Sequence, residues 1–405
     1  MYFFKKSKNE RIIFSAKIQG LIGIMYYFCQ NYIEMIERAN AVLVLEDGTT
    51  FHGKAIGKIG KAAGELAFNT GMTGYQEVFT DPSYLGQLVI MTSPHIGNYG
   101  TTASESESDH IQCAGIIVKK FSEVASRDIS DLPLQDFLVR DEKVGISDID
   151  TRALVRYIRS KGAMNAIISS NEDDKIEDLV EELKSVPSME GLELASRVST
   201  KEAYVSPSTT GKSHYKVALL DFGTKRNIAK CLNERDCEVK VFPMNSTLDE
   251  LLAYQPNGFM LSNGPGDPAV MTSSHQLVKE IIDTNIPVFG ICMGHQIIAA
   301  SQGLETEKMH QGHRGLNHPV LNHRTGKGEI TSQNHGFVVS RVSAEDNENI
   351  EITHSHLNDN TVAGIALKNK LVFSVQYHPE SSAGPHDSRY LFDNFVTNMD
   401  TYKQS

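Results

Sequence analysis

From residue 215 onward, short apolar runs alternate with segments of helical periodicity. The apolar runs are KVALLDFG, EVKVFP, GFMLSNGPGDP and PVFGIC, and they are separated by NIAKCLNER, LDELLAY and SSHQLVKEIIDT. Strands that are apolar on both faces and joined by helices of this length are typical of a parallel sheet covered on both sides. We therefore predict an α/β fold with a C-terminal doubly wound, mainly parallel sheet domain over residues 215–400.

The preceding part of the chain has a different pattern. AVLVLEDGTTFHG alternates apolar and polar residues around Asp47 and Gly48, which predicts a β-hairpin. Further along, ISDIDTRALVRYIRSKGA places apolar residues at helical spacing after Asp150, a good helix N-cap. These features predict an N-terminal α+β domain over residues 36–195.

A polar segment separates the two predicted domains. Residues 200–214, TKEAYVSPSTTGKSH, are rich in Ser and Thr, which predicts a linker over residues 196–214. The string Gly211, Lys212 and Ser213 imitates the end of a phosphate-binding loop. The motif also requires a glycine five places before Gly211, where Ser206 stands, so we reject that assignment.

Residues 1–35 differ from everything that follows. A basic start is followed by the apolar run LIGIMYYFC, which resembles the first two regions of a signal peptide, but no small-residue cleavage site follows. We expect a leader that is disordered or untranslated in the native protein, whose start would then be near Met35. A weakly helical tail and an export signal are the alternatives.

Composition narrows the class of function. The net charge is -11, and the chain contains 39 basic against 50 acidic residues, which argues against a nucleic-acid surface. No apolar run approaches the roughly 20 residues that a membrane helix needs. The five cysteines are odd in number and form no CxxC pair, so we expect a reducing cytoplasm and neither disulfides nor a thiolate zinc site. Histidine pairs such as His354 and His356 are expected on solvated strands or loops, and no metal site is predicted.

The segment FGICMGHQ carries the first sign of chemistry. Cys292 follows an apolar strand and precedes a helical pattern, with Gly290 and Gly294 on either side, as in the G-x-S-x-G nucleophile elbow. Such a turn strains the nucleophile's backbone and brings strand and helix too close for side chains at the two glycines. The helix N-terminus also favours the thiolate form of a cysteine.

Two further segments supply what a nucleophile needs. LVFSVQYHPES places His378 and Glu380 one residue apart in an extended segment, so both side chains project to the same side. NGPGD, residues 263–267, offers backbone N–H groups that, with that of Met293, would form an oxyanion hole. A core cysteine, a surface histidine and an ordinary turn would explain each feature alone. Together in one α/β domain they indicate a cysteine nucleophile with a histidine base.

These segments resemble the class I glutamine amidotransferases over residues 215–398. The resemblance to one branch, the carbamoyl phosphate synthetase small subunits, extends over residues 36–398. It is carried by HPESSAGPHD, GHRGLNHPV and SQNHGF, and in the first domain by LEDGTTFHG, FNTGMTGYQEVFTDPSYLGQ and ISDIDTRAL.

The resemblance implies a catalytic triad of Cys292, His378 and Glu380, which hydrolyses glutamine through a thioester. It implies a heterodimer in which a large synthetase subunit receives ammonia and makes carbamoyl phosphate from bicarbonate. ATP and Mg would be used by that partner, and this chain would need no cofactor. Whether the product serves arginine or pyrimidine synthesis stays open. The implied glutamine-binding residues are Ser83, Gly264, Gly266, Met293, Gln296, Asn334, Gly336 and Phe337.

The chain departs from the family pattern at three positions. Met293 stands where leucine is frequent, and Arg314 and Leu316 stand where a histidine and a glycine are usual.

Two other functions share some of these motifs or this fold. One is the glutaminase of anthranilate or aminodeoxychorismate synthase, which lacks a counterpart of residues 36–195, and the other is a catalytically silent assembly subunit.

Overall fold

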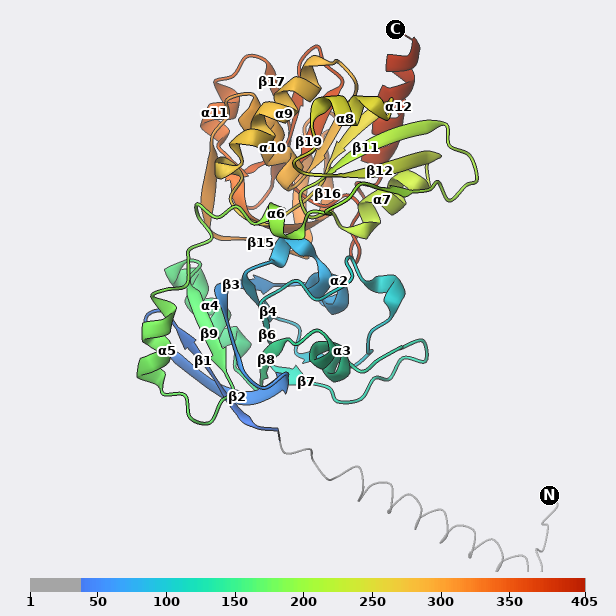
Figure 1. The fold of residues 1–405 in the computed structure, drawn as a ribbon. Coiled ribbons are helices and arrows are strands. Elements are labelled where there is room, and N and C mark those ends of the chain that lie inside the picture. The colour runs from blue at the N-terminus through green and yellow to red at the C-terminus, as the bar shows by residue number, and fades with distance from the viewer. Residues whose placement is uncertain (1–37, 405) are drawn as a thin grey trace, which may run out of the picture. The chain divides into compact units, whose positions relative to one another are not determined.

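The first part of the chain forms a closed β-barrel with strand order β1-β2-β8-β6-β4-β3-β9 (Figure 1). The predicted hairpin is confirmed, since β1 and β2 pair antiparallel on either side of Asp47 and Gly48. Gly48 has φ +84°, which the tight turn requires and glycine adopts freely. The barrel strands are β1 (Asn40–Leu45), β2 (Thr50–Gly57), β3 (Lys61–Asn69), β4 (Gln87–Met91), β6 (Gly115–Ile117), β8 (Val144–Ser147) and β9 (Asn165–Ser169).

Helices and short connections surround this barrel. The predicted N-cap is confirmed, because the Asp150 side chain accepts a 3.0 Å hydrogen bond from the N–H of Ala153 at the start of α4. Leu154 and Ile158 of that helix are fully buried. The elements are α2 (Tyr75–Thr80), α3 (Leu134–Arg140), α4 (Thr151–Lys161), α5 (Ile176–Leu183), the 3-10 turns η1 (Pro82–Tyr84) and η2 (Ala103–Glu105), and the strand pair β5 (His95–Ile96) and β7 (Lys120–Phe121).

The second part of the chain is built on a ten-stranded sheet of order β10-β12-β11-β13-β14-β19-β18-β17-β15-β16. The five strands from β12 to β19 are parallel to one another, as the alternating pattern predicts, while β10 and the strands beyond β19 pair antiparallel. The strands are β10 (Tyr204–Ser206), β11 (Tyr215–Asp221), β12 (Cys237–Pro243), β13 (Gly258–Leu261), β14 (Val288–Ile291), β15 (Thr306–Asn322), β16 (Lys327–Val339), β17 (Ile350–His356), β18 (Val362–Leu367) and β19 (Val372–Val375).

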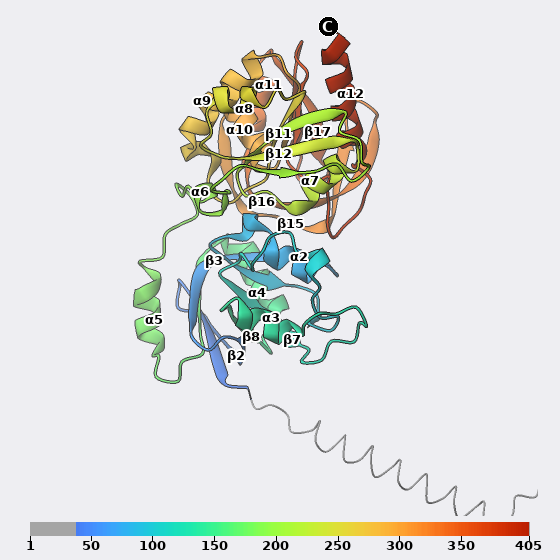
Figure 2. The same ribbon diagram turned by 45° about the vertical axis from the view of Figure 1, so that its right-hand side comes forward.

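Two apolar layers cover the faces of this sheet. One layer contains buried residues of α8 to α11, including Leu251 and Val278, and the other contains buried residues of α7 and α12, including Ile228 and Phe395. Figures 1 and 2 show these two groups of helices on either side of the strands. The fold is therefore the predicted α/β class. The helices are α7 (Arg226–Asn233), α8 (Leu248–Ala253), α9 (Thr272–Asp283), α10 (Met293–Ser301), α11 (Arg341–Glu345) and α12 (Tyr390–Gln404), with the 3-10 turn η3 (Pro268–Val270).

The structure is a computed structural model and describes residues 38–404. The leader expected over residues 1–35 lies outside the described residues. The segment expected to be a linker contains ordered elements: α6 (Ala195–Val198) lies at its start, and β10 pairs with β12 at the edge of the sheet. Strand β10 lies at the edge of the sheet and buries little apolar surface, so it can form from a polar, Ser- and Thr-rich segment. The sequence pattern therefore did not predict it.

The barrel and the sheet domain meet along β15 and at the start of α7. The N–H of Thr70 donates to the carbonyl oxygen of Arg314 at 3.2 Å, and the N–H of Arg226 donates to that of Glu107 at 3.0 Å. Figures 1 and 2 both place β15 beside β3. Residues of both domains can therefore contribute to one site.

Candidate active site

Cys292 occupies a sharp turn between β14 and α10. Its backbone has φ +54° and ψ -101°, a conformation that costs a non-glycine residue about 1–3 kcal/mol. The N–H of Cys292 donates to the carbonyl oxygen of Val375 at 2.9 Å, and that of Gly294 donates to Ser262 at 2.9 Å. These bonds from neighbouring strands hold the strained turn. The predicted nucleophile elbow is thus present.

The glycines beside Cys292 are needed because strand and helix pass very close to each other. A Cβ on Gly290 would lie 2.6 Å from Cδ1 of Ile298, and one on Gly294 would lie 2.3 Å from the carbonyl oxygen of Leu261. The second clash is with backbone, which has little freedom to move. The collision expected from the sequence is confirmed.

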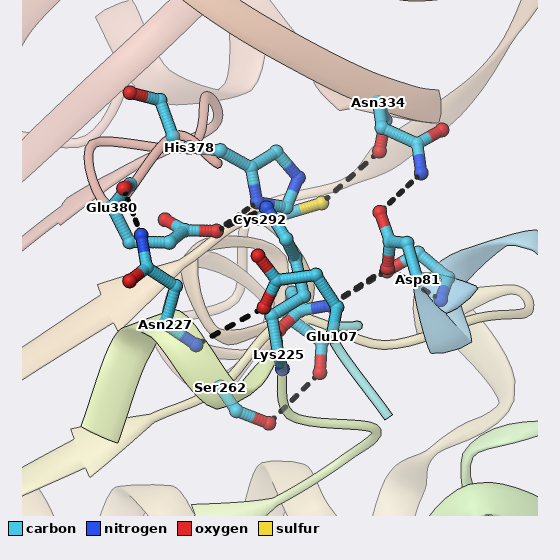
Figure 3. A network of polar contacts seen from close by, with 12 residues as sticks. Asp81, Glu107, Lys225, Asn227, Ser262, Cys292, Asn334, His378 and Glu380 are labelled. Atoms are coloured by element: carbon cyan, nitrogen blue, oxygen red, sulfur yellow. Dashed lines mark hydrogen bonds and ion pairs between the residues drawn. The ribbon is translucent and has the colours of Figure 1, made fainter. Parts of the chain in front are cut away.

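His378 and Glu380 lie beside the elbow, just beyond the end of β19. Nδ1 of His378 and Oε1 of Glu380 are 2.7 Å apart, and both side chains are almost completely buried. Figure 3 shows the imidazole ring next to the sulfur of Cys292. The structure therefore brings together the three residues that the sequence selected as nucleophile, base and orienting group.

Electrostatics favour a charged form of this pair. Burial lowers the pKa of His378, but the Glu380 carboxylate outweighs burial and raises it to about 10. Burial likewise raises the pKa of Glu380, while the Lys225 ammonium and the His378 imidazole together lower it to about 2. At neutral pH, His378 is therefore an imidazolium and Glu380 a carboxylate.

A buried lysine that is not among the predicted site residues completes the charge balance. Nζ of Lys225 lies 3.0 Å from Oε1 of Glu380, and its side chain is 5% exposed. Burial lowers the pKa of Lys225, but Glu380 together with Glu107 and Asp81 of the barrel domain raises it above its usual range. Asn227 donates from its side chain to the carbonyl oxygen of Glu380 (Figure 3). The barrel thus contributes two carboxylates to the surroundings of the triad.

Lys225 had a signal in the sequence that we did not use. It follows β11 by a few residues, at the carboxyl end of a central parallel strand, where ligands bind in sheets of this kind. Asp81 and Glu107 had no such signal, because they come from the other domain.

All eight predicted glutamine-binding residues line one pocket with Cys292. Its lining includes backbone that can donate hydrogen bonds, carboxamides and a hydroxyl, which suits a small polar amino acid. The predicted residues in the lining are Ser83, Gly264, Gly266, Met293, Gln296, Asn334, Gly336 and Phe337.

Hydrogen bonds from both domains hold several of these side chains in place. The Asp81 carboxylate accepts from the side-chain amide of Asn334 at 2.9 Å, while the Asn263 amide donates to the hydroxyl oxygen of Ser83 at 2.8 Å. In the sheet domain, the Gln296 amide donates to the carbonyl oxygen of Phe337 at 2.8 Å. The pocket is therefore organised across the junction between the domains.

The elements of an oxyanion hole lie at the same place. Met293 is the first residue of α10, and the N–H groups of a helix's first turn have no acceptor within the helix. Gly264 and Gly266 line the pocket beside Cys292, and Gly266 has φ +98°, which a side chain would disfavour. Backbone N–H groups can thus approach an oxygen bound next to the sulfur.

Three histidines on β15 and β17 lie close enough together to be considered as a metal site. Among the described residues, His313, His318 and His356 have nitrogen atoms within 4.8 Å of one another, and Oδ2 of Asp359 lies 2.7 Å from Nε2 of His313. The rings of His313 and His356 stack at 4.1 Å with an interplanar angle of 16°. A bound ion must lie near the plane of each imidazole, so these stacked rings do not converge on one ion. The cluster is a hydrogen-bonded network in this arrangement.

The histidine pair of β17 corrects one expectation. His354 and His356 were expected on a solvated strand or loop, but they are only 5% and 2% exposed. The strand lies inside the sheet between β15 and β18, so both of its edges are paired.

Within residues 38–404, no helix combines the length and apolar character needed to cross a bilayer.

Comparisons with known proteins identify two family domains in the chain. A family model described as "Glutamine amidotransferase class-I" matches residues 218–398, and one described as "Carbamoyl-phosphate synthase small chain, CPSase domain" matches residues 43–168. The second match covers most of the barrel, whose strands run from Asn40 to Ser169.

Curated relatives match over nearly the whole chain. Carbamoyl phosphate synthase small chains from Synechococcus sp., Parasynechococcus marenigrum and Staphylococcus haemolyticus are 45%, 47% and 48% identical to it. The alignments cover 91%, 89% and 91% of this chain and 95%, 96% and 98% of the relatives. The chain therefore belongs to the carbamoyl phosphate synthase small chains, the glutamine-hydrolysing subunits of that enzyme.

Proposed function

We propose that Cys292, His378 and Glu380 hydrolyse the side-chain amide of glutamine. The sulfur of Cys292, as thiolate, attacks the amide carbon, and the N–H of Met293 with the 263–267 segment stabilises the oxyanion. His378 donates its proton to the departing nitrogen, which leaves as ammonia while a glutamyl thioester remains. His378, now neutral, takes a proton from water as the water attacks the thioester, which releases glutamate and restores the sulfur.

The observation that carries this proposal is the position of His378. Its ring nitrogen Nδ1 lies 2.7 Å from the carboxylate of Glu380, and the ring lies beside a cysteine held in a strained turn. The Glu380 carboxylate also raises the pKa of His378. A cationic base next to the sulfur is the arrangement that activates a cysteine nucleophile. Because the whole group is buried, its charges act at low dielectric and with little competition from solvent.

The eight predicted pocket residues would hold the substrate. Ser83, Gln296 and Asn334 offer side-chain donors and acceptors, while Gly264, Gly266, Met293, Gly336 and Phe337 offer backbone groups. Their convergence on a single pocket with Cys292 supports this assignment. Asp81 would act indirectly, because it fixes the amide of Asn334.

We further propose that ammonia passes to a large synthetase subunit in the cytoplasm. The relatives are called small chains, which supports the existence of a larger partner chain. That partner would use ATP and Mg to activate bicarbonate, and this chain would need no cofactor. Direct transfer matters because ammonia released to water is protonated and loses its nucleophilicity. The barrel, which carries the family's own signature over residues 43–168, is the candidate docking module.

A glutaminase assay tests the catalytic proposal. We expect the purified chain to release glutamate from glutamine slowly, and faster with a large synthetase subunit present. Cys292→Ser should lower the rate by on the order of 10⁴ or more while glutamine still binds. Cys231→Ala, at a buried cysteine of α7 outside the pocket, is the matched control and should retain activity. If neither the chain nor the complex forms glutamate, the silent assembly subunit becomes the better interpretation.

A further inference from the structure

The glutamine pocket contains a buried positive charge that the proposed mechanism does not use. Two basic side chains of permanent charge line the pocket, Lys308 and Arg314. Nζ of Lys308 lies 2.6 Å from a carboxylate oxygen of Glu65, so this lysine is neutralised. Among residues 38–404, no carboxylate lies within ion-pair distance of Arg314. The pocket therefore carries one uncompensated cation.

Arg314 is buried more deeply than such a charge normally is. The residue is 4% exposed, and its guanidinium donates to one protein acceptor, the carbonyl oxygen of Gln311, at 2.9 Å from Nη1. Its Nε is buried without an acceptor. A guanidinium has five N–H donors, and a buried arginine without an anion is costly unless a ligand supplies one.

The guanidinium lies between two glycines at the wall of the pocket. Nη1 is 2.4 Å from the position that a Cβ on Gly312 would take, and Nη2 is 3.2 Å from the corresponding position on Gly336. Arg314 also pairs with Asn334 across β15 and β16. Asn334 and Gly336 are two of the proposed glutamine-binding residues, so the free donors lie next to the substrate.

The other titratable groups nearby do not cancel this charge. Burial, followed by the charge of His313, lowers the pKa of His335 well below its usual value, so His335 is neutral at pH 7. Glu65 is already paired with Lys308. Glutamine carries an α-carboxylate at the end remote from its reacting amide, and a guanidinium is the side chain best suited to bind a carboxylate through two parallel hydrogen bonds.

We propose that Arg314 binds the α-carboxylate of glutamine and makes the pocket specific for the free amino acid. The inference rests on the proposed function, because it assumes that glutamine occupies this pocket with its side-chain amide at Cys292. The assigned role is binding and specificity, with no part in proton transfer.

The test compares two substrates that differ only at the α-carboxylate. L-glutamine is compared with its α-amide, whose side-chain hydrolysis yields isoglutamine, and both products are quantified by mass spectrometry. For Arg314→Gln we expect kcat/KM for glutamine to fall roughly 10- to 100-fold, mainly through KM, because a charge-assisted hydrogen bond is lost. For the α-amide, kcat/KM should stay within about threefold, and Arg314→Lys should restore part of the glutamine activity.

Controls separate this role from a structural one. Lys308→Gln removes the neutralised cation of the same pocket, and the ratio of kcat/KM between the two substrates should stay as in the unmodified chain. The thermal midpoint and the rate at which iodoacetamide modifies Cys292 show whether each variant keeps its folded site. An equal loss on both substrates in Arg314→Gln, with the fold intact, would overturn the proposal. If the unmodified chain hydrolyses neither substrate, the proposed function itself has failed, which is a different result.

Discussion

The two domains contribute to the active site in different ways. The sheet domain supplies the groups that would react, and each is positioned locally: Cys292 by a turn of five residues, and His378 and Glu380 by a short extended segment. The barrel supplies Asp81 and Glu107, which lie far away in sequence and reach the site only through the packing of the domains. Local geometry thus positions the reactive groups, and contacts between domains set their charges and their partners.

The two carboxylates of the barrel act on the charge of Lys225, which lies in the sheet domain beside Glu380. With Asp81 and Glu107 in place, burial of the lysine is compensated, and Lys225 is free to stabilise the charged form of Glu380. Substitutions in the two domains should therefore differ in the size of their effect and in the kinetic constant that they change.

Among the variants that compare the two domains, the largest effect is expected at Glu380 of the sheet domain. In Glu380→Gln, the imidazolium of His378 loses its carboxylate, so burial and Lys225 both lower the pKa of His378. We expect kcat/KM for glutamine to fall roughly 10³-fold, by analogy with other catalytic triads that lose their orienting carboxylate. Glu351→Gln, which breaks an exposed pair with Arg324, should leave the rate unchanged. A rate within threefold of the unmodified chain would mean that Glu380 has no role in catalysis.

Glu380→Gln should also change how the free energy of unfolding depends on pH. In the unmodified chain the pKa of His378 is raised to about 10, so its contribution to the free energy of unfolding is complete below about pH 6.5. That contribution declines between about pH 6.5 and pH 10. In this range the folded state still holds a proton on His378 that the unfolded state has already released. Urea unfolding at pH 7 and pH 9 should show this decline, and Glu380→Gln should show less of it. Parallel pH dependences would contradict the assigned charge state.

A smaller effect is expected where the barrel meets the pocket. In Asp81→Asn, the side-chain amides of Asn334 and Asn263 both lose a charged acceptor. We expect KM for glutamine to rise about tenfold while kcat changes less, since the hydrogen bond positions a binding residue. Steady-state kinetics measure both constants. Asp131→Asn, at a barrel carboxylate that accepts from the N–H of Ala103, is the control. A loss confined to kcat would instead place Asp81 in the chemical step.

The smallest effect is expected at the exposed edge of the same junction. Arg226 and Asp109 form an ion pair between the domains, with side chains 50% and 81% exposed. Solvent and salt screen such a pair, so Arg226→Gln should lower the free energy of unfolding by less than about 1 kcal/mol and leave kcat/KM unchanged. Chemical denaturation at low and high salt measures this. A loss comparable to that of a buried pair would mean that the junction depends on its surface charges.

The sequence by itself determined the features that depend on residues close together in the chain. The order of strands and helices in the sheet domain, the hairpin at Gly48 and the N-cap at Asp150 were predicted from local patterns and are present. The nucleophile elbow at Cys292 and the contact between His378 and Glu380 belong to the same class. Turn chemistry, hydrophobic periodicity and short spacing carry this information because each acts over a few residues.

Tertiary structure decided everything that depends on pairing between distant segments. The closure of the barrel, the antiparallel extension of the sheet and the edge strand β10 had no local signal. The same holds for the pairing of Lys308 with Glu65, which leaves Arg314 as the uncompensated charge of the pocket. The physical reason is that burial and electrostatic compensation are properties of a three-dimensional neighbourhood, and a charged residue has the same appearance in the sequence whether it is solvated, paired or kept for a ligand.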